Sequence, residues 1–524
     1  MVTASRICAF FLVSLLLAGC DNSPAKTPDT NQGQHNQLDL PANIDWFNGT
    51  VENAFAEAKQ RNKPVFLYWG AVWCPPCHEL KATIFKQQAF IDQSKLFIPV
   101  YLDGDTQQAQ LYAEKFSVYG YPTVIVFSPQ GDEITRLPGG VDIQRYVGLL
   151  ELAINAIRPV SALVAAVQQG ETISRADWKL LSYYSWGQDR GKVFAETTSN
   201  TEQHQLFALL AESCPDDLPI AKSRLQMLAM GQWALLEASD SPAYQQQRAD
   251  YLGQITSILA DSKLRDANQD SLIYAGVSLV PALADGSQTM SLQQQFVDRV
   301  EGIFANPDLD MMVRLRALSA WVALQNSAFT DGQTFSADQL QWIAESAAWG
   351  EASVDKYQYH GAVNSLWQTL YDAGLVDSAR SLLNRALTIS KHPYYFMPDL
   401  GYLEAQQGNN AEALNWYKKA WDNSVGPATR TQWGVNYVIN LIALSPEDTA
   451  TIGSASQMII SELATQDKGL YQRNSVRMGQ LSDSLLSWAE NPERQQMLGK
   501  IRAQMAELCA SPEDLQRAGC HLLR

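Results

Sequence analysis

The sequence has few basic side chains. Lysine and arginine number 39 against 55 aspartates and glutamates, which leaves a net charge of −16. A surface with this excess of negative charge repels phosphate backbones, so we expect no nucleic-acid partner. Hydrophobic residues make up 46% of the 524 residues, which is typical of a folded chain. The length exceeds what one hydrophobic core supports, so we expect at least two domains.

Long hydrophobic runs are also scarce. The only one, residues 9–19, follows Arg6 and is too short to span a bilayer comfortably, which is typical of an export signal. Its end, LAGC at residues 17–20, resembles a bacterial lipoprotein signal, in which Cys20 would be lipidated and become the new N-terminus. The small residues before Cys20 favour this interpretation over an ordinary secretory signal. By the same resemblance, Asp21 favours retention at the inner membrane.

Residues 21–40 contain only three apolar side chains, and Pro24 and Pro28 interrupt any helix. We therefore predict a flexible tether with a reach of roughly 25 Å between a lipid at Cys20 and the next domain. This placement, on the periplasmic side of a bacterial membrane, allows disulfides to form. Cys8 would leave with the signal, so five of the seven cysteines remain for the folded part.

Helical and strand patterns alternate over residues 41–158. Apolar spacing predicts helices near 51–58, 77–84, 109–116 and 143–157, and short apolar runs predict strands at 64–70, 96–102, 123–128 and 133–137. This order predicts an α/β domain with a mixed sheet and helices on both faces.

Strand patterns are missing from residues 159–524, where alanine, leucine, glutamine and serine recur at helical spacing. One repeat is clear, over about 360–427: Gly374, Ala379, Ala386 and Pro393 recur 34 residues later as Gly408, Ala413, Ala420 and Pro427. A 34-residue period of helix pairs resembles tetratricopeptide repeats. We therefore predict a large all-α region of helical repeats after the α/β domain.

Two cysteines, Cys74 and Cys77, are separated by Pro75 and Pro76. Such a CxxC sequence can be half of a zinc site, a haem-attachment motif or a redox dithiol. Zinc needs a second ligand pair, and the next cysteine, Cys214, is distant and alone, so we expect no metal. His78 completes a formal CxxCH haem motif, but haem attachment does not require the strand and helix that flank these cysteines.

The redox interpretation agrees with this strand–cysteine–helix order. The positive end of a helix dipole and its free N–H groups favour a thiolate, which is the nucleophile. Cys74 would then be the nucleophile and Cys77, one turn further, the resolving thiol. The pair would form a redox-active disulfide and needs no cofactor.

The segment KPVFLYWGAVWCPPC at residues 63–77, including Trp73, resembles the thioredoxin superfamily. It is particularly similar to the C-terminal thioredoxin domain of the bacterial membrane disulfide reductase. The resemblance covers about residues 42–157. The sequence GYPT at 120–123 resembles the family's cis-proline loop, which implies that Pro122 is cis and faces the dithiol.

One position departs from the family pattern. Tyr68 stands where the family commonly buries an acid that relays the proton of the resolving thiol, and a phenol is a poor base near neutral pH. Water, or Glu79 if it pointed inward, would replace it, although a solvated Glu79 is favoured. Because Pro75 and Pro76 lack N–H groups, the thiolate of Cys74 gains little stabilisation, which favours a reductase over an oxidase. A protonated His78 ring near Cys74 would lower the pKa of that thiol and weaken this preference, but we expect His78 to be a surface residue.

The remaining cysteines carry no motif. Cys509 and Cys520 lie 11 residues apart and could form a structural disulfide, whereas Cys214 is expected to be a buried free thiol.

We therefore expect a membrane-tethered thiol–disulfide oxidoreductase that reduces protein disulfides and receives electrons from a membrane or periplasmic donor. The alternative is a non-catalytic interaction lipoprotein that acts through its helical repeats.

Overall fold

The computed structural model describes residues 40–137, 143–156, 158–189, 191–195, 197–330, 332–466 and 469–523. The predicted signal peptide, the lipidation site Cys20 and the predicted tether up to residue 39 lie outside these residues.

Four strands form one mixed sheet in the order β2–β1–β3–β4. They are β1 (Val65–Gly70), β2 (Ile98–Asp103), β3 (Thr123–Phe127) and β4 (Glu133–Leu137). Strand β1 runs parallel to β2 and antiparallel to β3, and β3 pairs antiparallel with β4. The turn between β3 and β4 contains Gly131 at a φ of 97°, a conformation that favours glycine.

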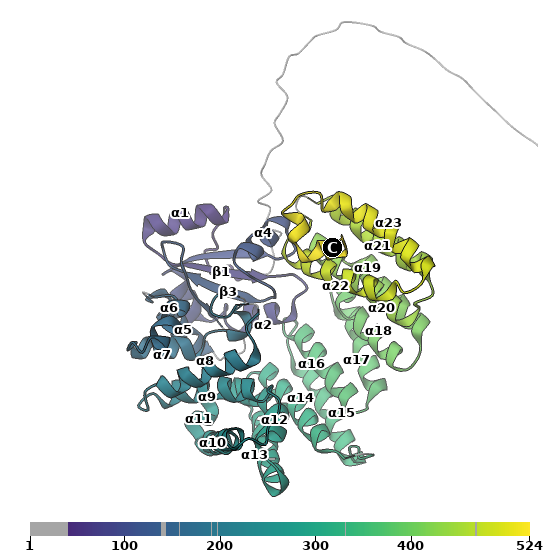
Figure 1. Cartoon of the computed structure of the whole chain (residues 1–524). Helices are drawn as coiled ribbons and strands as arrows, with labels where there is room; N and C mark the ends of the chain where they lie inside the picture. The colour runs from purple at the N-terminus through teal and green to yellow at the C-terminus, as the bar shows by residue number, and fades with distance from the viewer. Residues whose placement is uncertain are drawn as a thin grey trace, which may run out of the picture. The chain divides into compact units, whose positions relative to one another are not determined.

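Helices cover both faces of this sheet (Figure 1). On one face, Val65, Leu67 and Trp69 of β1 share a core with α1 (Val51–Arg61) and α4 (Gln107–Lys115). The alternate side chains Phe66 and Tyr68 point to the other face, as the two-residue period of a strand requires.

Aromatic rings fill the core of that second face. The ring centre of Phe85, which follows α2 (Pro75–Thr83), lies 5.0 Å from that of Tyr68. The ring centre of Phe90 in α3 (Gln88–Ser94) lies 6.2 Å from that of Tyr146 in α5 (Ile143–Ile154). Helix α3 was not expected, because its seven residues are too few for a helical period to stand out. The predicted mixed sheet is confirmed.

The rest of the chain is helical, and no described residue after β4 belongs to a strand. The α-helices of this part, which we call the helical part, are α6 (Val160–Gln168), α7 (Arg175–Ser182), α8 (Asn200–Ser213), α9 (Pro219–Trp233), α10 (Pro242–Ala260), α11 (Ser262–Ala267), α12 (Gln269–Leu283), α13 (Gly286–Ala305), α14 (Met311–Ala328), α15 (Ala337–Ser353), α16 (Tyr359–Asp372), α17 (Val376–Ile389), α18 (Met397–Gln406), α19 (Asn410–Asn423), α20 (Pro427–Leu444), α21 (Thr449–Ala464), α22 (Gln472–Trp488) and α23 (Pro492–Leu508). The predicted all-helical region is thus confirmed. Short 3₁₀ turns lie at Trp186–Gln188, Pro393–Tyr395, Asp514–Gln516 and Ala518–Leu523.

The 34-residue sequence period corresponds to two helix pairs, α16–α17 and α18–α19. Gly374 and Gly408 follow the first helix of each pair and have φ values of 84° and 79°. Ala379 and Ala413, in the second helix of each pair, are fully buried. Small side chains at these positions let the paired helices approach closely.

The sheet and the helical part belong to one compact unit. Helix α2 lies next to α16, and α4 lies next to α22 (Figure 1). Cys509 and Cys520 form a disulfide that joins the end of α23 to the last 3₁₀ turn. Among the described helices, none combines the length and the apolar character of a membrane span.

Candidate active site

The CxxC sequence lies where β1 ends and α2 begins. Cys74 is the N-cap of α2, and its Sγ accepts a hydrogen bond of 3.2 Å from the backbone N–H of Cys77. Pro75 and Pro76 occupy the first helical turn without N–H groups, so the N–H of Cys77 is the first of this helix that can reach the sulfur. Cys74 and Cys77 form a disulfide, with their Cα atoms 5.2 Å apart.

Pro122 lies at the start of β3. The Tyr121–Pro122 peptide bond is cis, and Thr123, the next residue, pairs with Trp69 near the end of β1. The cis-proline loop therefore meets the same edge of the sheet from which the CxxC segment leaves. The ring of Tyr121 packs in one cluster with Trp73 and both cysteines.

Trp73 is fixed by a carboxylate that the sequence did not single out. Its indole Nε1 donates a hydrogen bond of 2.6 Å to Oδ2 of Asp105, in the loop after β2. Oδ1 of the same carboxylate accepts a 2.5 Å hydrogen bond from the hydroxyl of Thr429 in α20. Burial raises the pKa of Asp105, although both hydrogen bonds act in the opposite direction.

Tyr68 replaces the expected acid without taking over its function. It is fully buried, burial raises its pKa, and its hydroxyl donates a hydrogen bond of 3.4 Å to the carbonyl oxygen of Cys77. A buried phenol of raised pKa stays protonated at neutral pH, so Tyr68 supports the turn at Cys77 and accepts no proton. Asp103, at the end of β2, has a pKa raised to about 6, mainly by burial.

Two expectations for α2 are wrong. Glu79 is neither solvated nor free to serve Cys77, because it forms a 2.6 Å ion pair with Arg316 of α14 and its side chain is only 15% exposed. His78 is not a surface residue: its ring lies 5.9 Å from that of His360 in α16, and its Nε2 lies 2.6 Å from the carbonyl oxygen of Val72. Both side chains are covered by helices distant in sequence.

The helical part also covers the dithiol itself. Cys74 is 2% exposed and Cys77 is fully buried. Tyr395, in the 3₁₀ turn before α18, stacks on Trp73 with ring centres 6.1 Å apart. The guanidinium of Arg473 in α22 lies 4.9 Å from the centre of the Trp73 ring. The sequence carried no local signal for these contacts.

Asp399 is a second carboxyl with a pKa near neutrality, raised to about 7 by burial in α18. No described residue forms a hydrogen bond or ion pair with its carboxylate. The folded chain therefore holds a proton that the unfolded chain loses near pH 4, and stability falls as pH rises from about 4 to about 7. Because the side chain is partly exposed, we expect Asp399→Asn to stabilise the chain at pH 8 by about 1–2 kcal/mol.

The urea midpoints of the two chains, compared at pH 4 and pH 8, measure this difference. The midpoints should coincide at pH 4 and separate at pH 8. Asp308→Asn, which changes an exposed carboxyl, is the control and should give no separation. A pH-independent difference for Asp399→Asn would contradict the assignment.

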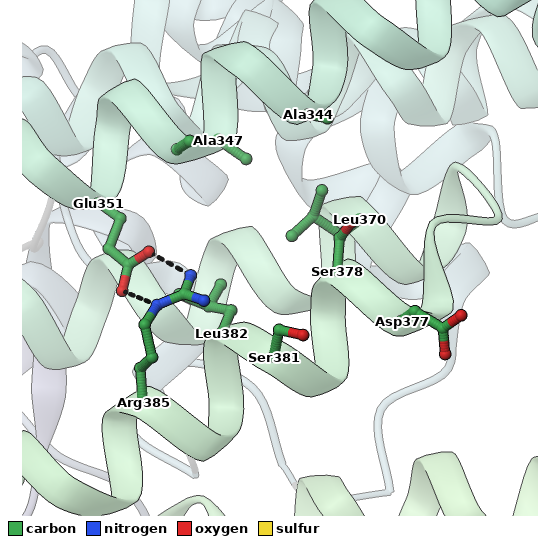
Figure 2. Close-up of a pocket in the computed structure, with 10 residues that line it drawn as sticks. Ala344, Ala347, Glu351, Leu370, Asp377, Ser378, Ser381, Leu382 and Arg385 are labelled. Carbon is green, nitrogen blue, oxygen red and sulfur yellow. Dashed lines mark hydrogen bonds and ion pairs between the residues drawn. The ribbon is translucent and has the colours of Figure 1, made fainter.

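The helical part also holds pockets away from the dithiol. One, of about 300 Å³, lies between α15 and α17, where Glu351 and Arg385 form an ion pair at one end and small side chains line the walls (Figure 2). It contains no cysteine and no residue of the CxxC site. In the described ranges, no cluster of three or more His, Cys, Asp or Glu side chains could hold a metal ion. Cys214 is a buried free thiol, and burial raises its pKa to about 11.

Comparisons with known proteins agree with this geometry. Residues 51–154 match the family model described as a thioredoxin-like domain. A 120-residue stretch is 29% identical to thiol:disulfide interchange protein DsbD 1 of Pseudomonas aeruginosa, covering 22% of this chain and 19% of that protein. DsbD of Photorhabdus laumondii is 29% identical over 23% of this chain and 21% of its own length.

A third relative, DsbD of Vibrio vulnificus, is 35% identical over 17% of this chain and 16% of its own length. The chain thus spans about a fifth or less of each of these relatives. The residues that match the family model, 51–154, include the CxxC segment and the cis-proline loop. Residues 51–154 are therefore a thioredoxin-like domain, similar to part of the DsbD interchange proteins and followed by a large helical part.

Proposed function

We propose that this chain is a thiol–disulfide oxidoreductase that reduces disulfides of proteins. The observation that carries the proposal is the disulfide between Cys74 and Cys77 at the N-terminus of α2, beside the loop of Pro122. The family match and the relatives named as interchange proteins support it.

In the proposed cycle, the Cys74 thiolate attacks a substrate disulfide. A bond forms between Cys74 and one substrate sulfur, and the other substrate sulfur leaves as a thiolate that takes a proton. The Cys77 thiolate then attacks Cys74, which releases the second substrate thiol and forms the Cys74–Cys77 disulfide. Two electrons pass to the substrate, and an external dithiol donor must return them.

The first turn of α2 supports the proposed direction of electron flow. A thiolate at Cys74 gains the partial positive charge of the helix end and one backbone donor, the N–H of Cys77. Pro75 and Pro76 supply no further donors. A weakly stabilised thiolate makes the disulfide less oxidising, which favours a reductase.

The proposed location is the periplasmic side of a bacterial membrane, preferably the inner membrane, with a lipid on Cys20 as anchor. The LAGC sequence and the polar segment after it support this location. The electron donor would then be a membrane or periplasmic dithiol. We propose that the helical repeats select or hold the substrate proteins, since helical arrays offer extended surfaces.

The proposal is tested by electron transfer from the reduced chain to insulin. The chain is reduced, freed of reductant and mixed with oxidised insulin. We expect two new insulin thiols for each Cys74–Cys77 disulfide that forms, and none with Cys74→Ser. A Cys509→Ser/Cys520→Ser chain is the control and should transfer electrons like the native chain. Absence of transfer both from the native chain and from a chain in which Cys74 is freed from the helices that cover it would favour the alternative, a non-catalytic interaction lipoprotein.

A further inference from the structure

The sulfur that must meet the substrate is closed off. Thiol–disulfide exchange requires the attacking thiolate to reach a substrate sulfur directly, so access limits the rate. Yet Cys74 is 2% exposed. A protein disulfide does not reach a sulfur in this position unless the surrounding residues move.

The residues that close the site come from the helical part. Tyr394, Tyr395, Met397 and Trp433, which we call the aromatic cover, pack with Trp73, Tyr121 and both cysteines in one cluster. Arg473 lies over the same two rings, with its guanidinium 4.9 Å from the ring centre of Trp73 and 5.6 Å from that of Tyr121. The face that substrate would contact is therefore occupied by this chain.

Several polar contacts join the two parts, among them hydrogen bonds from Gln472 to Glu114 and Val118, and we call three others the polar latch. Each joins the thioredoxin-like domain to the helical part: Glu79 to Arg316 at 2.6 Å, Asp105 to Thr429 at 2.5 Å, and Glu114 to Arg517 at 2.6 Å. They involve α2, the loop after β2 and α4 in turn, so they join three different elements of the thioredoxin-like domain to the helical part.

Two features of the contact between the thioredoxin-like domain and the helical part favour its opening. Two of the three latch contacts are partly exposed ion pairs, which stabilise a structure only slightly. Nη1 of Arg473 and Nδ1 of His360 are buried there without an acceptor or donor among the described residues. Leaving such groups unpaired destabilises the closed arrangement, whereas water satisfies them when it opens.

We propose that the helical part is an autoinhibitory cover on the substrate-binding face of the thioredoxin-like domain, and that release of the polar latch exposes Cys74. The proposal rests on the proposed function, because a cover matters only if Cys74 reacts with substrate. The cover itself is a matter of access and is measurable without any substrate.

The test is the alkylation rate of Cys74 in the reduced full-length chain. Iodoacetamide is added at several pH values, and the modified Cys74 peptide is followed by mass spectrometry. The pH profile gives the thiolate fraction, so that access is compared at equal thiolate concentration with free cysteine. We expect the native chain to react at least about 100-fold more slowly than free cysteine thiolate.

A latch variant, Arg316→Ala/Thr429→Val/Arg517→Ala, changes only the helical part and should raise the rate at least about tenfold. The matched control, Arg385→Ala/Thr388→Val/Arg494→Ala, removes polar side chains that do not contact the thioredoxin-like domain and should leave the rate unchanged. Circular dichroism checks that both variants are folded.

Two results would overturn the cover: a native rate equal to that of free cysteine thiolate, or equal rates in the folded latch variant and its control. If the latch variant does not fold, the native rate alone decides. Slow alkylation together with no transfer to insulin by the latch variant would refute the proposed function and leave the cover standing.

Discussion

A Cys77→Ser chain, once reduced and incubated for a long time with oxidised insulin, should accumulate as a covalent adduct through Cys74, slowly because the helical part covers that sulfur most of the time. The first attack still joins Cys74 to a substrate sulfur, but no second thiolate is present at the N-terminus of α2 to release it. Cys214 does not replace Cys77, since it is buried and its pKa is raised to about 11. We expect most chains in the adduct, at least about tenfold more than for the native chain.

Non-reducing electrophoresis measures the adduct, and dithiothreitol should cleave it by reducing the mixed disulfide. Cys74→Ser/Cys77→Ser is the control and should form none. An adduct of equal yield in this control would show that another cysteine carries the reaction, and the assignment of Cys74 as nucleophile would then fail.

Asp105→Ala should destabilise the chain strongly, although Asp105 belongs to a loop. The substitution leaves two buried donors, the indole N–H of Trp73 and the hydroxyl of Thr429, without their acceptor. Each unsatisfied donor costs about 1–3 kcal/mol, so we expect a loss of about 2–6 kcal/mol. Because Trp73 precedes the nucleophile, the same change loosens the wall of the site.

The shift of the urea midpoint measures this loss. Asp308→Ala, at an exposed carboxyl, is the control and should change the midpoint little. A double variant with Thr429→Val should lose less than the sum of the two single variants, because the two residues share one hydrogen bond. Additive losses would mean that Asp105 and Thr429 do not interact.

The local part of the site could be predicted from sequence. The strand before Cys74 and the helix after it depend on neighbouring residues and on well-known backbone preferences, whereas the loop at Pro122 was expected from its resemblance to the thioredoxin superfamily. The four strands were found for the same reason: each combines apolar side chains with turn signals at its ends. Helix α3 was missed because a helix of seven residues leaves no periodic pattern.

The surroundings of the site could not be predicted. Glu79 meets a residue 237 positions away, Asp105 one 324 away, and Glu114 one 403 away. Such pairs follow from how the helices stack, and a single sequence carries no local signal for them. Glu79 and His78 were misjudged for this reason: helical position alone suggested solvent, but α14 and α16 cover them.

The most direct measurement for the whole account is a redox titration of the Cys74–Cys77 pair in the full-length chain. The chain is equilibrated in dithiol buffers, quenched and scored by the alkylation of both cysteines. We predict one reversible two-electron transition, nearer to about −270 mV, as for thioredoxin, than to about −120 mV, as for a strong oxidant. A midpoint potential near about −120 mV would contradict the proposal that the chain is a reductase. The absence of any reversible transition would contradict the assignment of Cys74 and Cys77 as a redox site.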